Sequence, residues 1–153
     1  MFEFANHILD DLHPILNHFP IAFLVASFFL VFAKRRWTAL AHTEWLLFAW
    51  GAMLTLPASI TGLVAHEAYE ETSVHGTIET HGLPANLGTV VMLVMVVWRW
   101  RSRRQGLEND VGERTWYPIF ALVGLLWIFV VGGTGGSLTY DYGINVRGVN
   151  PLK

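Results

Sequence analysis

Cysteine is absent from this chain of 153 residues, and charged residues are scarce. Without cysteine, the chain alone has no disulfide, no thiolate metal ligand, no covalently attached c-type haem and no iron–sulfur cluster. Charged residues make up 14% of the sequence, against about 25% in soluble domains, and hydrophobic residues make up 53%. Composition and length together indicate an integral membrane protein of one domain.

Four long stretches carry no charged residue at all, at roughly 15–32, 45–64, 82–98 and 116–140. Each is close to the ~20 residues that a helix needs to cross a bilayer. Apolar residues in them are continuous rather than alternating, which favours helices over strands. The sequence therefore predicts an all-α fold, an integral membrane four-helix bundle. Residues 1–153 form a single transmembrane domain with spans at roughly 14–34, 44–66, 80–100 and 116–139.

Basic residues are distributed unevenly between the two sides of this bundle. Eight of the ten follow the first or the third span: Lys34, Arg35, Arg36, Arg99, Arg101, Arg103, Arg104 and Arg114. The positive-inside rule makes that side cytoplasmic. An even number of spans then puts both termini on the opposite side. We predict a multi-pass protein of the bacterial inner (cytoplasmic) membrane with both termini on the periplasmic side. Residues 1–13 lack the basic start of a signal peptide and are expected to form a short interfacial helix.

This topology gathers most of the histidines at the periplasmic edge. Six of the seven fall there: His7, His13, His18, His66, His75 and His81. Only His42 falls on the cytoplasmic side. Neutral imidazole is a ligand for zinc, copper, iron and nickel, and it titrates near neutral pH. The crowding of imidazoles therefore predicts a metal or cofactor site at this edge.

His18 is the first candidate ligand. It lies more than one turn inside the first apolar stretch, where an ionisable side chain is costly unless it is paired or coordinated. His66 or His81, each at the outer end of another span, is the expected ligand opposite it. His13 also belongs to the predicted cofactor-binding set, although a capping or hydrogen-bonding role is its simpler interpretation.

Other residues near this edge are candidates for supporting roles. Asn86 follows His81 and is expected to orient its ring, as hydrogen-bonding partners of metal ligands do. Tyr140 is expected to anchor the fourth span at the interface or to donate a hydrogen bond to a bound group. Small residues in the fourth span let helices or a flat macrocycle approach closely: Gly132, Gly135 and Gly136. No internal repeat is evident, although both halves begin with a proline early in a helix.

Histidines on different helices at one depth favour a haem site. Bis-histidine ligation needs two imidazoles on opposite faces of a slot, and helix bundles build such sites from facing positions. We therefore predict a small membrane redox subunit, similar to a b-type cytochrome, with one haem b near the periplasmic face. It would pass electrons between quinol or a membrane complex and a periplasmic partner. This is an electron-transfer component rather than a stand-alone enzyme, with no catalytic residues of its own.

Two other functions are compatible with the same residues. The first is a non-haem site for Zn, Cu or Fe, with imidazole and carboxylate ligands at the outer rim. Its candidate ligands are His66, Glu70, His75, Glu79 and His81. The second is a cofactor-free accessory subunit that packs against a larger complex. An optical spectrum with metal analysis separates the three, and no nucleic-acid partner is expected.

Two motifs resemble a known family. HPILNHFPIAF at 13–23 and GGSLTYDYGINV at 135–146 are similar to the opening and closing motifs of a bacterial four-helix membrane protein family, domain of unknown function 2231. The resemblance covers essentially the whole chain. The family often has an acidic residue shortly after the glycine that ends the second span. Here His66 and Glu67 follow Gly62, which marks a histidine-enriched variant.

The resemblance also implies a cellular context. Domains of this family are fused to, or encoded beside, Rieske-type and c-type cytochrome domains. This implies electron transfer at the periplasmic face. The expected partners are the lipid bilayer, quinone, and a periplasmic cytochrome c, a Rieske-type protein or a larger membrane complex.

Overall fold

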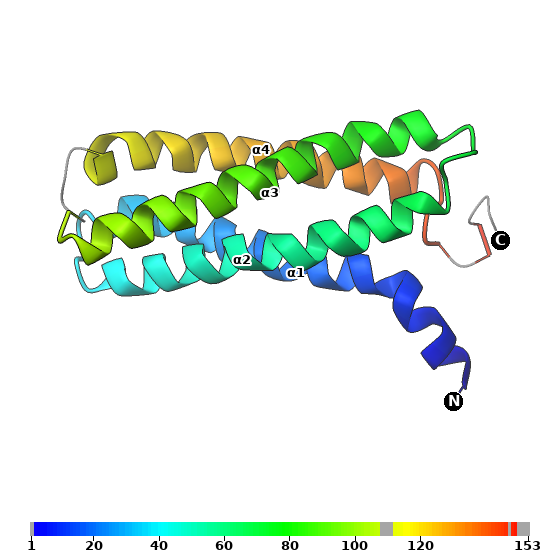
Figure 1. Cartoon of the computed structure of the whole chain (residues 1–153), viewed down its shortest axis with the longest axis horizontal. Coiled ribbons are helices and arrows are strands. Elements are labelled where there is room, and N and C mark those ends of the chain that lie inside the picture. Colours follow the sequence, from blue (N-terminus) through cyan, green and yellow to red (C-terminus); the bar gives the residue numbers. More distant parts are fainter. Residues whose placement is uncertain (1, 108–111, 147, 150–153) are drawn as a thin grey trace.

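Four long helices build the protein in the computed structural model, which describes residues 2–107, 112–146 and 148–149 and the side chains from residue 12 onward, except 112–113 (Figure 1). The helices are α1 (Phe2–Ala33), α2 (Leu40–Glu67), α3 (His75–Arg104) and α4 (Tyr117–Tyr140), and a short π-helical turn, η1 (Gly112–Trp116), leads into α4. The described residues contain no strand. The predicted all-α four-helix bundle is confirmed. Arg147, Lys153 and the side chains of residues 1–11 lie outside the described parts.

All four helices are long and apolar enough to cross a membrane, over Leu12–Ala33, Leu40–Glu67, His75–Arg104 and Arg114–Tyr140. Large apolar side chains such as Phe29, Val64 and Phe129 are exposed on their outer surfaces. A helix closes its own backbone hydrogen bonds, so these surfaces are suited to lipid. The chain is therefore a multi-pass membrane protein.

The start of α1 differs from the expected arrangement. The helix begins at Phe2 and continues into the first span, so residues 2–13 are part of α1 and not a separate short helix. Its first turns lean away from the bundle (Figure 1). Pro14 and Pro20 lie inside this helix, and proline is a common cause of such bends because it removes a backbone hydrogen bond.

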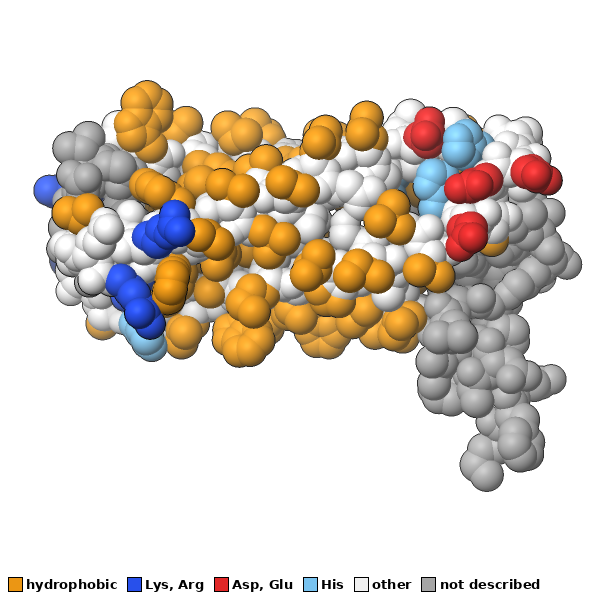
Figure 2. Space-filling view, in the orientation of Figure 1, with side chains coloured by type: hydrophobic (Ala, Val, Ile, Leu, Met, Phe, Trp, Pro, Cys, Tyr) orange, Lys and Arg blue, Asp and Glu red, His pale blue; other side chains and the backbone are white. Residues whose placement is uncertain are grey.

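The neighbouring pairs in the bundle are α1–α2, α2–α3, α3–α4 and α4–α1, so α1 and α3 are diagonal to each other. Charge is segregated along the bundle (Figure 2). We call the end with the α1–α2 turn the basic end, with Lys34, Arg35, Arg36, Arg101, Arg103 and Arg104. The end with the α2–α3 connection is the acidic end, with Glu67, Glu70, Glu71 and Glu79. The assignment of the acidic end to the periplasm stays a prediction of the positive-inside rule.

The half of the bundle near the basic end is tightly packed. Its core consists of Leu24, Phe28, Val31, Phe48, Ala52, Met92, Tyr117, Ala121 and Ile128. Phe28 lies directly on Gly124, where an added Cβ would be 2.6 Å from the ring. Phe48 meets the Tyr117 ring edge to face, with centroids 5.4 Å apart. Close contact of rings with small residues is the usual way in which membrane helices associate.

A buried cluster of charged side chains lies in this half of the bundle, near the basic end. Glu44 is fully buried and accepts two hydrogen bonds from Arg99, of 2.8 and 2.9 Å, and one from Lys34 of 2.7 Å. Tyr117 Oη and Ser27 Oγ also donate to its carboxylate, at 3.0 and 3.2 Å. These five side chains come from all four helices. A charge inside a membrane is tolerated when it is paired in this way, and here the pairing also ties the helices together.

Candidate functional site

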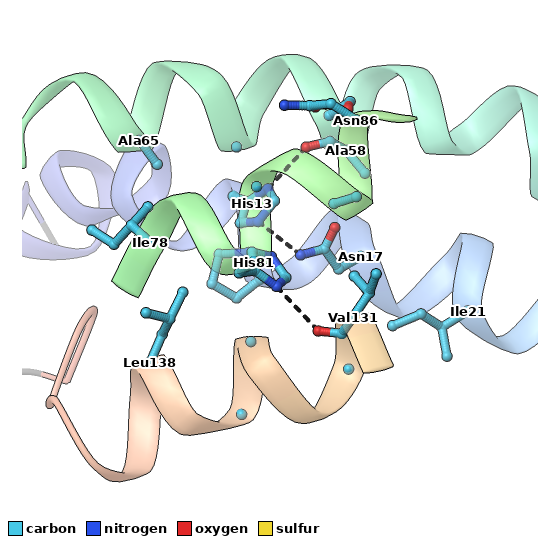
Figure 3. A pocket seen from close by; sticks show the side chains of 18 of the residues that line it. His13, Asn17, Ile21, Ala58, Ala65, Ile78, His81, Asn86, Val131 and Leu138 are labelled. Carbon is cyan, nitrogen blue, oxygen red and sulfur yellow. Dashed lines mark hydrogen bonds between the residues drawn. The ribbon is translucent and has the colours of Figure 1, made fainter. Parts of the chain in front are cut away.

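A cavity of about 500 Å³ lies in the half of the bundle near the acidic end, and residues of all four helices line it (Figure 3). Apolar side chains such as Ile21, Ile78 and Leu138 form much of the wall. A few polar side chains stand among them: His13, Asn17, His81 and Asn86. A largely apolar cavity with a few convergent polar groups is the common form of a cofactor or small-molecule site.

His13 extends from α1 and is held by α2. Its Nδ1 lies 2.9 Å from the carbonyl oxygen of Ala58 and 3.3 Å from Thr61 Oγ1. A carbonyl oxygen only accepts, so we assign the proton to Nδ1 and the lone pair to Nε2. Asn17, one turn further along α1, donates its amide to that Nε2 over 2.9 Å. The ring is thus fixed in one tautomer and one orientation.

His81 extends from α3 and is held by α4 in the same manner. Its Nδ1 lies 3.1 Å from the carbonyl oxygen of Val131 and 3.2 Å from Thr134 Oγ1. By the same reasoning, Nδ1 carries the proton and Nε2 the lone pair. Among the described residues, the structure gives this Nε2 no hydrogen-bond partner.

The two hairpins, α1–α2 and α3–α4, therefore repeat one arrangement. In each hairpin, a histidine on the first helix contacts two groups on the second helix. One is a backbone carbonyl oxygen, and the other is the hydroxyl of the threonine three residues after that carbonyl. A glycine follows that threonine and supports the imidazole. A Cβ on Gly62 would lie 2.7 Å from His13 Cε1, and a Cβ on Gly135 would lie 2.9 Å from His81 Cε1. Both positions need glycine, because any larger residue would displace the ring.

The two imidazoles face each other across the cavity. Their ring centroids are 6.5 Å apart, and the ring planes are inclined by 77° (Figure 3). Because α1 and α3 are diagonal in the bundle, the pair meets at its centre. The rings are anchored on α2 and α4, so the site depends on the positions of all four helices.

Asn86 and Trp127 complete the cavity wall. Ser59 Oγ of α2 donates a hydrogen bond to Asn86 Oδ1. Asn86 therefore bonds to α2. The groups that contact His81 Nδ1 and orient its ring are the Val131 carbonyl and the Thr134 hydroxyl. Trp127 Nε1 donates to the carbonyl oxygen of Pro84 over 2.9 Å, which joins α4 to α3 on the other side.

A family described as predicted membrane protein (DUF2231) matches residues 9–148. The chain belongs to this family. No curated protein and no solved structure matches it. The resemblance drawn from the two sequence motifs is confirmed. The match includes every residue of the two repeated arrangements.

Two predicted site residues of this DUF2231 protein lie at the cavity mouth. The side chain of His18 is exposed, and its Nδ1 donates to the Pro14 carbonyl oxygen of its own helix over 2.6 Å. Tyr140 lies at the end of α4 and is 89% exposed. Both border the cavity, yet the ring that faces His81 is that of His13.

The five predicted non-haem ligands are divided between two places. His66 and His75 stack on each other at the acidic end, with centroids 5.2 Å apart. Glu79 Oε1 lies 3.7 Å from His75 Nε2. His66 also lines the cavity, as His81 does, whereas Glu70 is exposed and outside it. Within the described part of the chain, no three His, Cys, Asp or Glu side chains converge as a metal-binding group.

Proposed function

We propose that this DUF2231 protein is a small membrane redox subunit that binds one b-type haem between His13 and His81. The observation that supports this most is the facing pair of neutral imidazoles on diagonal helices. Each has its Nδ1–H fixed by a backbone carbonyl. That bond leaves Nε2 with a lone pair, and a bonded Nδ1–H is the usual companion of a ligating Nε2.

The separation of the two rings agrees with ligation from opposite sides. Two imidazoles on one iron, each with a bond of ~2.0 Å, have ring centres about 6 Å apart. The rings of His13 and His81 are 6.5 Å apart. Glycines of α3 and α4 that line the cavity and have little or nothing within 4 Å leave space for a flat group: Gly82, Gly132 and Gly136. Asn17 donates a hydrogen bond to His13 Nε2. Its side chain would have to move before that nitrogen could bind iron.

The chain's own residues supply orientation and surroundings. Ala58 and Val131 hold the imidazoles by their carbonyls, and such bonds also raise the basicity of the ligating nitrogen. The apolar wall limits access of water, which tunes the potential of a buried redox centre. When bound, the haem would supply a one-electron couple, and His13 and His81 would both be used to hold it. This favours electron transfer over catalysis.

The place of the cavity suggests where electrons enter and leave. It lies near the acidic end, where Glu67, Glu70 and Glu71 are exposed. We propose that this end faces the periplasm of a bacterial inner membrane. A periplasmic cytochrome c, a Rieske-type protein or a larger membrane complex would dock there, and quinol would exchange electrons from the lipid side. Acidic surfaces attract and orient partners with a basic face.

A reduced-minus-oxidised optical spectrum of the purified protein tests the proposal. The protein is expressed with ample haem and measured in detergent, with a second sample reconstituted with haemin. We expect a b-type spectrum in the wild type and in the control variants His18→Ala and His42→Ala. His13→Ala and His81→Ala should lose it, while circular dichroism shows that they remain helical. Wild-type protein without haem in both samples would refute the proposal.

A further inference from the structure

His66 and His75 form a second pair of imidazoles, of which His66 also lines the cavity that contains His13 and His81. His66 lies in the last turn of α2, and His75 is the first residue of α3. Their rings are nearly parallel, inclined by 27°, with centroids 5.2 Å apart. The α2–α3 connection brings the two residues together at the acidic end, and Figure 2 shows histidine side chains surrounded by acidic ones there.

Two nitrogens of this pair have no partner. His66 Nε2 and His75 Nδ1 are both shielded from solvent, and neither makes a hydrogen bond in the described structure. Buried polar atoms are almost always bonded, and those that are not call for a missing ligand, ion or water. One such atom on each of two neighbouring rings is what a ligand shared by both would use.

We propose that His66 Nε2 and His75 Nδ1 bind a divalent transition-metal ion at the acidic end. Two imidazoles on one tetrahedral ion, with bonds of ~2.0–2.1 Å, have ring centres roughly 5 Å apart. The observed centroid distance of 5.2 Å matches this bent arrangement, and the nearly parallel rings would have to rotate for both nitrogens to point at one ion; the 6.5 Å of the cavity pair matches ligands on opposite sides. The two pairs are therefore suited to different groups.

Glu79 has the position of a supporting carboxylate. Its Oε1 lies 3.7 Å from His75 Nε2, the nitrogen that does not face the site. Metal-binding histidines commonly direct their other N–H at a carboxylate, which fixes the tautomer and strengthens the ligand. At 3.7 Å the contact is too long for a hydrogen bond, so Glu79 would have to move closer when the ion binds in order to keep the proton on Nε2 and the lone pair on Nδ1. Two of four coordination positions come from the pair, and water fills the others, so the ion is exchangeable.

The donor set selects the ion. Imidazole nitrogen suits zinc, copper, nickel and iron, and affinity rises toward copper and zinc, whereas calcium and magnesium prefer oxygen. Glu67, Glu70 and Glu71 are exposed at the same end of the bundle and attract cations without selecting among them. The site should therefore bind Zn²⁺ or Cu²⁺ and discriminate strongly against Mg²⁺.

Calorimetric titration with Zn²⁺ tests the site, on protein purified in detergent with a tag that contains no histidine. We expect one strongly bound Zn²⁺ per chain. His66→Ala and His75→Ala should each weaken it at least 100-fold, and Glu79→Gln about 10-fold. His42→Ala, at the basic end, is the matched control and should bind like the wild type. Circular dichroism and thermal unfolding verify that each variant remains folded.

Three outcomes would overturn the proposal. The first is a wild type that binds Zn²⁺ no more strongly than the double variant His66→Ala/His75→Ala. The second is equal affinity for Mg²⁺, which would assign binding to the acidic surface alone. The third is loss of Zn²⁺ in His13→Ala or His81→Ala with retention in the double variant, which would move the ion to the cavity. With Cu²⁺ in place of Zn²⁺, electron paramagnetic resonance should detect two coordinated nitrogens.

Discussion

The guanidinium of Arg99 and the carboxylate of Glu44 meet through two parallel hydrogen bonds, and both side chains are fully buried. Arg99 also lies over the Tyr117 ring, 3.8 Å from its centroid. The pair joins α2 to α3, while Lys34 and Tyr117 bring in α1 and α4. One half of the bundle is therefore fixed by charge and close packing, and the cavity lies in the other half.

Glu44→Gln should destabilise the protein strongly. The substitution leaves Arg99 and Lys34 without their shared anion, and breaking a buried pair costs about 3–5 kcal/mol. Thermal unfolding in detergent measures the effect. Glu70→Gln, at an exposed position, should change stability by no more than about 0.5 kcal/mol. Equal midpoints for the two variants would show that the cluster does not hold the helices together.

Gly62→Ala and Gly135→Ala should each impair haem binding, because the added Cβ would lie 2.7 Å from the His13 ring or 2.9 Å from the His81 ring. We expect at least a tenfold loss of affinity, measured by haemin titration. Gly133→Ala is the matched control in α4, since a Cβ there has no atom within 4 Å. If all three variants bind equally, the glycines do not position the imidazoles.

Glu70→Gln combined with Glu71→Gln should slow electron delivery from a basic periplasmic donor and flatten its dependence on salt. Both carboxylates are exposed at the acidic end, and attraction between exposed charges is screened by ions. Stopped-flow reduction at several ionic strengths measures this. The haem spectrum should be unchanged, because these residues do not line the cavity. Loss of the spectrum would instead give one of them a role in holding the cofactor.

A reporter fused after the last residue tests the sidedness. The basic residues near the α1–α2 turn and the end of α3 predict that this side is cytoplasmic. A reporter active only in the cytoplasm should therefore be silent at the C-terminus, and one active only in the periplasm should give signal. The reverse result would place the acidic end, and both histidine pairs, in the cytoplasm.

The helices were predictable because each charge-free stretch has the length of a bilayer crossing. The set of histidines at one end was predictable from depth alone. Which rings face each other was not, because this depends on the rotation of each helix about its axis. His13 and His18 are five residues apart, which is about 140° around a helix, so they point in different directions. Asn17 is four residues from His13 and shares its face, as the hydrogen bond between them shows.

One sequence signal for the cavity is a repeated Thr-Gly pair. Thr-Gly occurs at 61–62 and again at 134–135, once on the helix that follows each cavity histidine. The spacing from histidine to threonine differs, 48 residues in one half and 53 in the other, because the connections between helices differ in length. A search at a fixed period therefore fails, although the contacts are equivalent.

The repeated arrangement means that each hairpin carries one histidine, one threonine and one glycine of the cavity, and that the two sets are related by an approximate twofold axis along the bundle. A symmetric ligand on that axis would contact equivalent residues of the two hairpins, except at positions where the hairpins differ. Asn17 is such a difference, because it bonds to the Nε2 of His13, and the Nε2 of His81 has no counterpart in the described residues. A group bound between the two histidines would therefore have different surroundings on its two sides, because only the His13 side carries the amide of Asn17.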